Sequence, residues 1–350
     1  MKILSVVGTR PQFVKLAPIS EALKGRCEHI IVHTGQHYDE RLSDVFFAGL
    51  GIPDPDVQLG IGSGSHGVQT GAMLAALDEV LDQHRPDWVL VYGDTNSTLA
   101  AALAGVKLQL PVAHLEAGLR SFNRRMPEEH NRILTDHIAD LCLAPSDIAM
   151  RHLASEGLTS RSILVGDVMT DVFLQVAATV RDQPAPLPAG VNATDGYYLA
   201  TIHRAENTDD PTRLKSVISS LAGLNHPVLL LAHPRLLANV QRHGLHLQMG
   251  AIVVAEPAPY SDLIRLMQRS RGVVTDSGGL QKEAFLLRVP CTTVRNETEW
   301  TETVDLGWNV LATDLGQLRT YVERPRPAPT SAAPYGDGDA AQRVADILLG

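Results

Sequence analysis

Cysteine is scarce in this 350-residue sequence, and long apolar runs are missing from it. The three cysteines, Cys27, Cys142 and Cys291, are far apart and odd in number, which indicates neither a disulfide framework nor a thiolate zinc site. No apolar run approaches the roughly 18 residues that a membrane-spanning helix needs. The opening residues, MKILSVVGTRP, lack the apolar core and cleavage site of a signal peptide. We therefore expect a cytoplasmic protein with reduced thiols that binds no membrane.

Positive charge is also in short supply. Lysine and arginine number 30 against 39 aspartates and glutamates, which gives a formal net charge of -9. Because nucleic acids and anionic membranes attract clustered positive charge, this balance argues against both as partners. Hydrophobic residues make up 44% of the chain and charged residues 20%, proportions that argue against wholesale disorder. At about 150 residues per domain, the length predicts two domains.

The sequence does contain a regular alternation of short apolar runs with helical patterns. In the first half we expect strands at residues 3–7, 30–34, 88–92, 112–115, 141–144 and 163–165, and helices at 13–23, 68–82, 97–107 and 128–139. In the second half we expect strands at 198–202, 228–232, 252–255, 272–275 and 292–294, and helices at 210–221 and 263–269. Apolar strands separated by helices predict parallel sheets covered on both faces. Each half should therefore be a Rossmann-like, doubly wound α/β domain.

Two proline-rich stretches punctuate the chain. One spans residues 183–190, at the junction of the halves, and the other spans 324–334, ahead of a last amphipathic helix near 340–349. We expect domains at residues 1–170 and 171–335. Doubly wound sheets bind ligands at the carboxyl ends of their strands, so two such domains can hold a ligand in a cleft between them.

Polar motifs in the first half follow the predicted strands. Arg10 and Lys15 flank a helix that begins after the first strand, and a helix N-terminus attracts anions. The alternative is an ordinary strand–helix turn with two solvated cations. The turn is not GxGxxG, so the fingerprint of a dinucleotide site is missing.

Three carboxylates come next. Asp94 and Glu116 each follow a predicted strand, and Glu128 opens a helix. Asp94 could equally be a helix N-cap, and acidic residues in a first helical turn are ordinary partners of the helix dipole. Together, however, the three share one edge of the predicted sheet, where a general base or acid would lie.

The second half offers a histidine and a glycine-rich turn. His203 ends a predicted strand and can shuttle a proton near neutral pH, although a lone histidine is often structural. Ser277, Gly278 and Gly279 run from a strand into a helix, where backbone N–H groups can approach a diphosphate. Glu283, about one and a half turns further on, is placed to bind ribose hydroxyls. The alternative is a structural glycine-rich turn.

Taken together, in this order and spacing, the motifs resemble those of the non-hydrolysing UDP-N-acetylglucosamine 2-epimerases over nearly the whole chain. They lie at residues 8–11, 93–95, 114–120, 127–132, 203–204 and 276–281. The resemblance implies a two-domain fold of the GT-B type, with residues 336–350 returning to the first domain. It also implies a UDP-sugar substrate, a homodimer, and neither a cofactor nor a metal.

The same resemblance implies the chemistry. A base removes the C2 proton of the sugar while UDP leaves C1, and the resulting 2-acetamidoglucal takes UDP back with a proton on the other face. Asp94, Glu116 and Glu128 match the catalytic carboxylates of the family, although which of them is the base stays open. His203 matches a position that serves both catalysis and UDP binding. The further positions matched to UDP or phosphate binding are Arg10, Lys15, Ser277, Gly278, Gly279 and Glu283.

Some residues depart from the cell-wall enzymes of the family. Residues 121–127 resemble a branch that includes enzymes acting on UDP-2,3-diacetamido-2,3-dideoxyglucuronate. The extra carboxylate of that sugar requires a cation, for which Arg124 and Arg125 are available, and Arg120 is a further candidate as a sugar or charge partner. Residues 36–39, which match a stretch that contacts an activating second UDP-N-acetylglucosamine, keep only its Gln and His.

The sequence thus favours a UDP-N-acetylglucosamine 2-epimerase, with UDP-2,3-diacetamido-2,3-dideoxyglucuronate as the alternative substrate. Further alternatives are a hydrolysing epimerase that releases N-acetylmannosamine and UDP, a GT-B glycosyltransferase, and a non-catalytic sensor of nucleotide sugars. A hydrolysing epimerase would release a product without UDP. A glycosyltransferase would depend on an acceptor sugar, and a sensor would bind UDP without turnover.

Overall fold

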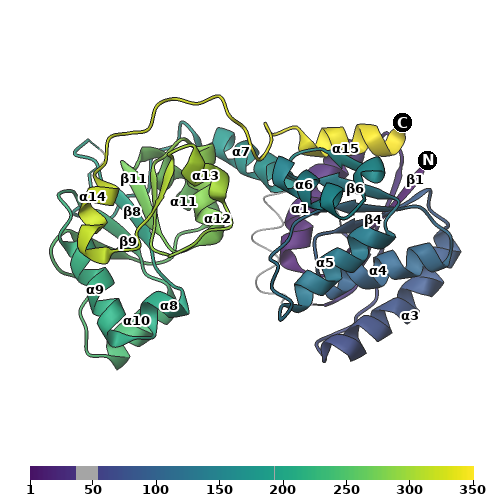
Figure 1. Cartoon of the computed structure of the whole chain (residues 1–350), viewed down its shortest axis with the longest axis horizontal. Coiled ribbons are helices and arrows are strands. Elements are labelled where there is room, and N and C mark those ends of the chain that lie inside the picture. Colours follow the sequence, from purple (N-terminus) through teal and green to yellow (C-terminus); the bar gives the residue numbers. More distant parts are fainter. Residues whose placement is uncertain (37–53, 193) are drawn as a thin grey trace. The chain divides into compact units, whose positions relative to one another are not determined.

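The computed structural model describes residues 1–36, 54–192 and 194–350, and the chain divides into two units (Figure 1). Unit 1 comprises Met1–Val172 and Ala333–Gly350, and unit 2 comprises Phe173–Ala332. The division falls inside helix α7 (Val168–Val180), so the proline-rich residues 183–190 lie within unit 2 and not at the junction. No helix in the described part of the chain is long and apolar enough to cross a membrane.

The described part of unit 1 is built on a parallel sheet with strand order β3-β2-β1-β4-β5-β6-β7. The central strands form because their residues are almost all apolar and buried from both sides; β1 alone buries five consecutive residues. The strands are β1 (Lys2–Val7), β2 (Glu28–His33), β3 (Val57–Gln58), β4 (Trp88–Tyr92), β5 (Val112–Leu115), β6 (Leu141–Ala144) and β7 (Ser162–Leu164).

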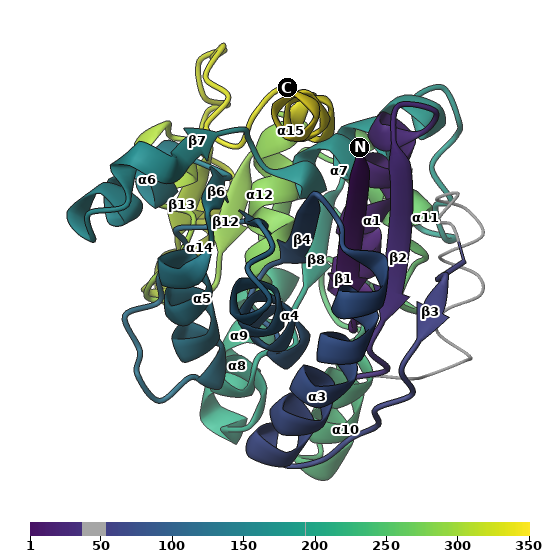
Figure 2. The same cartoon turned by 90° about the vertical axis from the view of Figure 1, so that its right-hand side faces the viewer.

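Helices cover both faces of this sheet. One face is covered by α3 (His66–His84), α4 (Asn96–Lys107) and α6 (Asp147–Ser155), with α5 (Pro127–Ile138) packed beside α4 and the 3-10 turn η1 (Thr159–Arg161) beside α6. The other face is covered by α1 (Arg10–Leu23) and α15 (Ala340–Leu349). Figure 2 shows α15 beside the N-terminal end of β1. The C-terminal helix therefore completes the core of unit 1.

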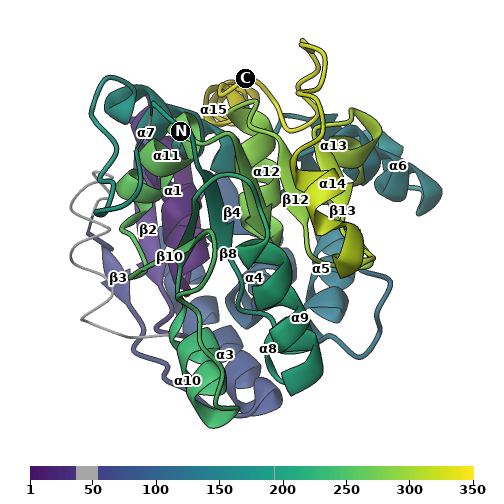
Figure 3. The same cartoon turned by 90° about the vertical axis from the view of Figure 1, so that its left-hand side faces the viewer.

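Unit 2 contains a second parallel sheet, with strand order β10-β9-β8-β11-β12-β13 (Figure 3). Its strands are β8 (Tyr198–Thr201), β9 (Val228–Leu231), β10 (Ile252–Ala255), β11 (Gly272–Thr275), β12 (Cys291–Thr293) and β13 (Asn309–Leu311). One face packs on α9 (Pro211–Ala222), α10 (Pro234–Arg242) and α14 (Leu318–Val322). The other packs on α7, α11 (Tyr260–Arg269) and α12 (Gly278–Leu286). Three short helical segments complete the unit: α8 (Ala205–Thr208), α13 (Thr301–Asp305) and η2 (Leu315–Gln317).

Both units confirm the predicted doubly wound α/β class. The strand predictions hold to within two residues at each end, since apolar runs flanked by polar residues mark them clearly. Strands β3 and β13, edge strands of 2 and 3 residues, are absent from the prediction.

Each sheet has a point at which its strand order reverses, between β1 and β4 in unit 1 and between β8 and β11 in unit 2. Ligands of doubly wound sheets bind beyond the carboxyl ends of the strands at such points. The strand register pairs Tyr92 with Leu115 and Thr201 with Thr275. The segments that follow these strands, which carry most of the predicted site residues, therefore start side by side.

Candidate active site

Glu116 directly follows β5 and forms an ion pair with Lys15 of α1. The two side chains are mostly buried, with exposed fractions of 22% and 12%. Burial alone would lower the pKa of Lys15, but Glu116 and, to a smaller extent, Asp167 and Asp94 raise it above its usual value. Lys15 therefore keeps its positive charge at neutral pH beside the Glu116 carboxylate.

The backbone of Glu116 is in the left-handed region, with φ of 73°. For a residue with a side chain this conformation costs about 1–3 kcal/mol and persists where the surroundings hold it in place. The N–H groups of Glu116 and Ala117 both donate to the carbonyl oxygen of Leu143, at 3.1 Å each. Gly118 also has positive φ, and a Cβ there would lie 2.5 Å from the carbonyl oxygen of Ala149. The loop is thus fixed on both sides of Glu116.

Asp94 follows β4 and forms an ion pair with Arg132 of α5. The Asn131 side-chain amide donates to the Asp94 carbonyl oxygen at 2.9 Å. The N-cap of α4 is Thr95, whose hydroxyl oxygen accepts from the backbone N–H of Thr98, so the alternative of Asp94 as a helix N-cap is wrong. A Cβ on Gly93 would lie 3.1 Å from Glu116 Oε2, which places the turn before Asp94 against the Glu116 carboxylate.

The first turn of α5 contains two glutamates in different environments. Glu129 is buried and accepts hydrogen bonds from Ser121 N–H (2.9 Å), Ser121 Oγ–H (2.8 Å) and Phe122 N–H (2.8 Å). Burial would raise the pKa of Glu129, but these bonds and Arg132 outweigh it and lower the pKa. The Glu128 carboxylate is half-buried and has no hydrogen bond among the described side chains. Glu129 therefore fixes the loop, and Glu128 takes no part in that set of hydrogen bonds.

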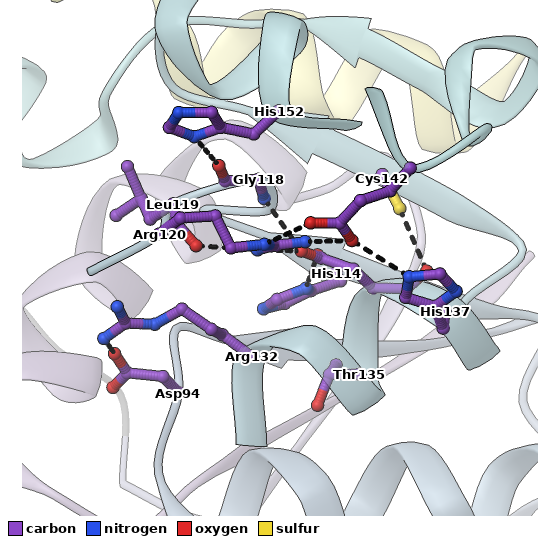
Figure 4. Close-up of polar contacts among 12 residues, drawn as sticks. Asp94, His114, Gly118, Leu119, Arg120, Arg132, Thr135, His137, Cys142 and His152 are labelled. Carbon is purple, nitrogen blue, oxygen red and sulfur yellow. Dashed lines mark hydrogen bonds and ion pairs between the residues drawn. The ribbon is translucent and has the colours of Figure 1, made fainter. Parts of the chain in front are cut away.

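Arg120 belongs to a network of charged side chains that is partly buried (Figure 4). Its side chain is 1% exposed and lies 2.7 Å from Asp136 Oδ2 and 2.7 Å from Glu156 Oε1. His137 Nε2 is 2.9 Å from the other Glu156 oxygen. Arg120 is thus a charge partner of two carboxylates of its own unit. The sequence predicted Arg120 as a partner of the sugar or of a charged group. It could not identify Asp136 and Glu156, because both are distant from Arg120 in the sequence.

Arg124 and Arg125 lie in the exposed segment between β5 and α5. The Arg124 carbonyl oxygen is 2.9 Å from His130 Nε2, and the Arg125 N–H donates to Asn123 Oδ1 at 3.1 Å. These contacts involve the backbone of the two arginines and order the segment that carries both guanidinium groups.

Several predicted residues are described only in part. Helix α1 begins at Arg10, as predicted for the turn after β1, but the Arg10 side chain lies outside the described structure. So do residues 37–39. The Gln36 side-chain oxygen accepts from the N–H (3.1 Å) and hydroxyl (2.7 Å) of Ser97, and it thereby anchors the start of α4.

In unit 2, His203 lies two residues beyond β8 and contacts Asp276, which follows β11. His203 Nδ1 is 3.1 Å from Asp276 Oδ1, and the fully buried Asp276 also accepts from the backbone N–H of Arg204 (2.9 Å) and from Asn207 Nδ2 (3.0 Å). Burial would raise the pKa of Asp276, but these donors lower it. An ionised Asp276 orients His203 through Nδ1 and leaves Nε2 for a ligand. Sequence reasoning missed Asp276 as a functional residue, although its place at a strand end was visible.

A pocket of about 350 Å³ opens beside His203 at the carboxyl ends of β8, β9 and β11. Its polar lining residues are Thr201, His203, His233, Tyr260, Ser277 and Glu283, with Gly279 and Leu280 at the start of α12. Ser277 is the N-cap of α12, so the predicted run from strand through Ser-Gly-Gly into a helix is confirmed. The pocket brings four predicted unit 2 residues, His203, Ser277, Gly279 and Glu283, to one place.

Glu283 accepts a hydrogen bond from the Tyr260 hydroxyl at 2.8 Å. Burial raises the pKa of Glu283 above its usual value, although Tyr260 and the charge of Lys282 offset part of the effect. Sequence reasoning missed Tyr260, which comes from a different helix and carries no motif. Among the described residues, no group of three or more His, Cys, Asp and Glu side chains could hold a metal ion.

Comparison with known proteins assigns the chain to a family. The model of the family described as UDP-N-acetylglucosamine 2-epimerase matches residues 21–349. A curated relative from Pseudomonas aeruginosa, UDP-2,3-diacetamido-2,3-dideoxy-D-glucuronate 2-epimerase, is 47% identical, with 99% of each chain covered. The solved structure of UDP-GlcNAc 2-epimerase from Methanocaldococcus jannaschii superimposes with a TM-score of 0.86 at 37% identity and 99% coverage of each chain. Its complex with UDP-GlcNAc and UDP superimposes with a TM-score of 0.77 at 38% identity and the same coverage. With the whole length of both units matched, this chain belongs to the UDP-N-acetylglucosamine 2-epimerase family.

Proposed function

We propose that the protein is a non-hydrolysing 2-epimerase of a UDP-linked 2-acetamido sugar, and that its substrate is UDP-2,3-diacetamido-2,3-dideoxyglucuronate. The observation that carries the reaction type is the pair of carboxylates, Asp94 and Glu116, beside the strand-order reversal of unit 1, with Gly93 against Glu116. The substrate rests on the 47% identical relative of that name. The exposed Arg124 and Arg125 support it, because they offer cations for the sugar carboxylate.

The proposed reaction begins with an elimination. A carboxylate takes the C2 proton, the C1–O bond breaks, and its electron pair leaves with UDP, so that a double bond forms between C1 and C2. Re-addition of the UDP oxygen to C1, with a proton delivered to the opposite face of C2, gives the other epimer. No redox step occurs, and atoms and charge balance over the cycle.

The two faces of C2 require two groups that exchange protons. Asp94, Glu116 and Glu128 are the candidates, and their different partners suit different roles. Glu116 forms an ion pair with Lys15, and Asp94 forms one with Arg132. Glu128 has no such cation among the described side chains, which leaves its carboxylate available to a bound sugar.

The proposed role of the unit 2 pocket is to bind UDP and to stabilise it as a leaving group. His203, oriented by Asp276, and the backbone N–H groups at the start of α12 are donors for the developing diphosphate charge. Glu283 lies further along α12 and can accept from the ribose hydroxyls. Arg10, at the start of α1, is proposed as a further phosphate ligand.

UDP-N-acetylglucosamine is the second candidate substrate, supported by the 39% identical curated relative from Methanocaldococcus jannaschii that bears this activity in its name. Proton NMR of the purified protein in D2O with each nucleotide sugar separates the candidates. Deuterium at C2 of both epimers, with UDP still attached, is expected with the diacetamido-uronate. Deuterium incorporation only with UDP-N-acetylglucosamine would make that sugar the preferred candidate substrate. Free sugar plus UDP would indicate the hydrolysing reaction. No exchange with either would contradict the proposed function.

We also propose that the protein is a homodimer in the cytoplasm, on the strength of the family resemblance. Sedimentation equilibrium tests the dimer, which predicts twice the chain mass of 37.8 kDa.

A further inference from the structure

Asp136 of α5 contacts the segment that carries Glu116 at three points. Asp136 Oδ1 is 2.7 Å from His114 Nδ1, and Oδ2 accepts from the Gly118 N–H at 3.0 Å and from Arg120 at 2.7 Å. These donors stand on both sides of Glu116 in the chain. The side chains of Asp136 and His114 are fully buried, so the bonds are made without competition from water.

His114 extends this contact to the loop that carries Asp94. Its Nε2 is 2.7 Å from the carbonyl oxygen of Gly93, and because a carbonyl oxygen can only accept, Nε2 is the donor. On the other side of the ring, a hydrogen bond of 2.7 Å joins Nδ1 to Asp136 Oδ1. One continuous series of hydrogen bonds thus joins the loop after β4 to the loop after β5.

This series of hydrogen bonds contacts the two loops whose geometry matters most for the proposed reaction. Glu116 has a left-handed backbone, a conformation that is strained for a residue with a side chain, so the loop should relax if the contacts that hold it are lost. Asp94 and Glu116 lie on different loops, and a displacement of about 1 Å at a reacting group can cost about 100-fold in rate.

We propose that Asp136 and His114 are positioning residues of the epimerase, which together hold Asp94 and Glu116 in reacting geometry. The proposal rests on the proposed function for the role of the two carboxylates. It differs from a purely structural role for Asp136, which would lower stability but leave the turnover of the folded enzyme unchanged.

Asp136→Asn tests the proposal, because it keeps the shape of the side chain but places an NH2 group against the donors of His114 or Arg120. We expect kcat for C2 exchange to fall about 10- to 100-fold. The KM for the nucleotide sugar and the Kd for UDP should stay near wild type, since Asp136 bonds to the loop that carries Glu116 and the proposed UDP pocket lies in unit 2. The matched control is Asp140→Asn, which alters an exposed aspartate that accepts from the Val112 N–H (2.9 Å) at the other end of β5. Its kcat should not change.

A spectroscopic measurement tests the contact itself. The proton between His114 and Asp136 should give a far-downfield resonance in the wild type and in Asp140→Asn, and none in Asp136→Asn or His114→Gln. In a crystal structure of Asp136→Asn, Glu116 should leave the left-handed region. A wild-type kcat in folded Asp136→Asn, an unmoved Glu116, or a wild type without the resonance would each overturn the proposal. Wild-type protein that exchanges no C2 proton would contradict the proposed function instead, and the resonance and the Glu116 conformation would still decide this inference.

Discussion

The replacement of Gly118 by alanine should separate backbone strain from a steric clash. Gly118 and Gly157 have nearly the same backbone angle, with φ of 83° and 79°, so alanine costs about 1–2 kcal/mol at either position through the left-handed conformation. At Gly118, the new Cβ would also lie 2.5 Å from the Ala149 carbonyl oxygen and 2.8 Å from Leu153 Cγ. At Gly157, no described atom lies within 4 Å of it.

The clash at Gly118 adds about 1–3 kcal/mol, the usual cost of overpacking. With a urea dependence of about 2 kcal/mol per molar, the unfolding midpoint of Gly118→Ala should lie about 0.5–1.5 M below that of Gly157→Ala. Because the loop must also move, Gly118→Ala should lose most C2 exchange, whereas Gly157→Ala keeps it. Equal midpoints for the two variants, or a fully active Gly118→Ala, would refute the reasoning.

Three further predictions follow from the described side chains. Asp94→Asn, Glu116→Gln and Glu128→Gln should each lower kcat about 100- to 10,000-fold with UDP affinity kept, as measured by C2 exchange and calorimetry; wild-type turnover in all three would contradict the catalytic assignment. Tyr260→Phe removes a donor that lowers the pKa of Glu283, so UDP affinity should begin to fall at a higher pH as the solution is acidified; an unchanged pH profile would argue against Glu283 as a UDP ligand. Burial raises the pKa of Asp171 from 3.8 to about 6, so its stabilising contribution should be lost as the pH rises from about 4 through 6, and Asp171→Asn should remove that part of the pH dependence of urea unfolding.

The parts of the candidate site that could be predicted are the residues that come just after a strand in the sequence. Glu116 directly follows β5, and Asp94 and Ser277 lie two residues beyond β4 and β11. The parallel topology therefore brings each of them to a sheet edge. Local pattern and topology sufficed for these residues, and likewise for nearly all strands.

The parts that could not be predicted depend on partners distant in the chain. Lys15 and Glu116 are separated by 101 residues, Arg120 and Glu156 by 36, and Tyr260 and Glu283 by 23. No periodicity or capping signal encodes such pairs. The left-handed conformation of Glu116 was equally hidden, because intrinsic preference argues against it and only the packed loop enforces it.

The return of helix α15 to unit 1 sets an order for the making of this protein. Unit 2 is continuous from Phe173 to Ala332, so all of it has been synthesised before the last helix leaves the ribosome. The core of unit 1 cannot be completed before α15 is synthesised, since Val344 and Leu348 of α15 belong to the same buried cluster as Leu16 and Ile19 of α1. A nascent chain interrupted before residue 340 would display that apolar surface to chaperones and proteases. The core of unit 1 is therefore complete only when residues 340–349 have joined residues 1–172.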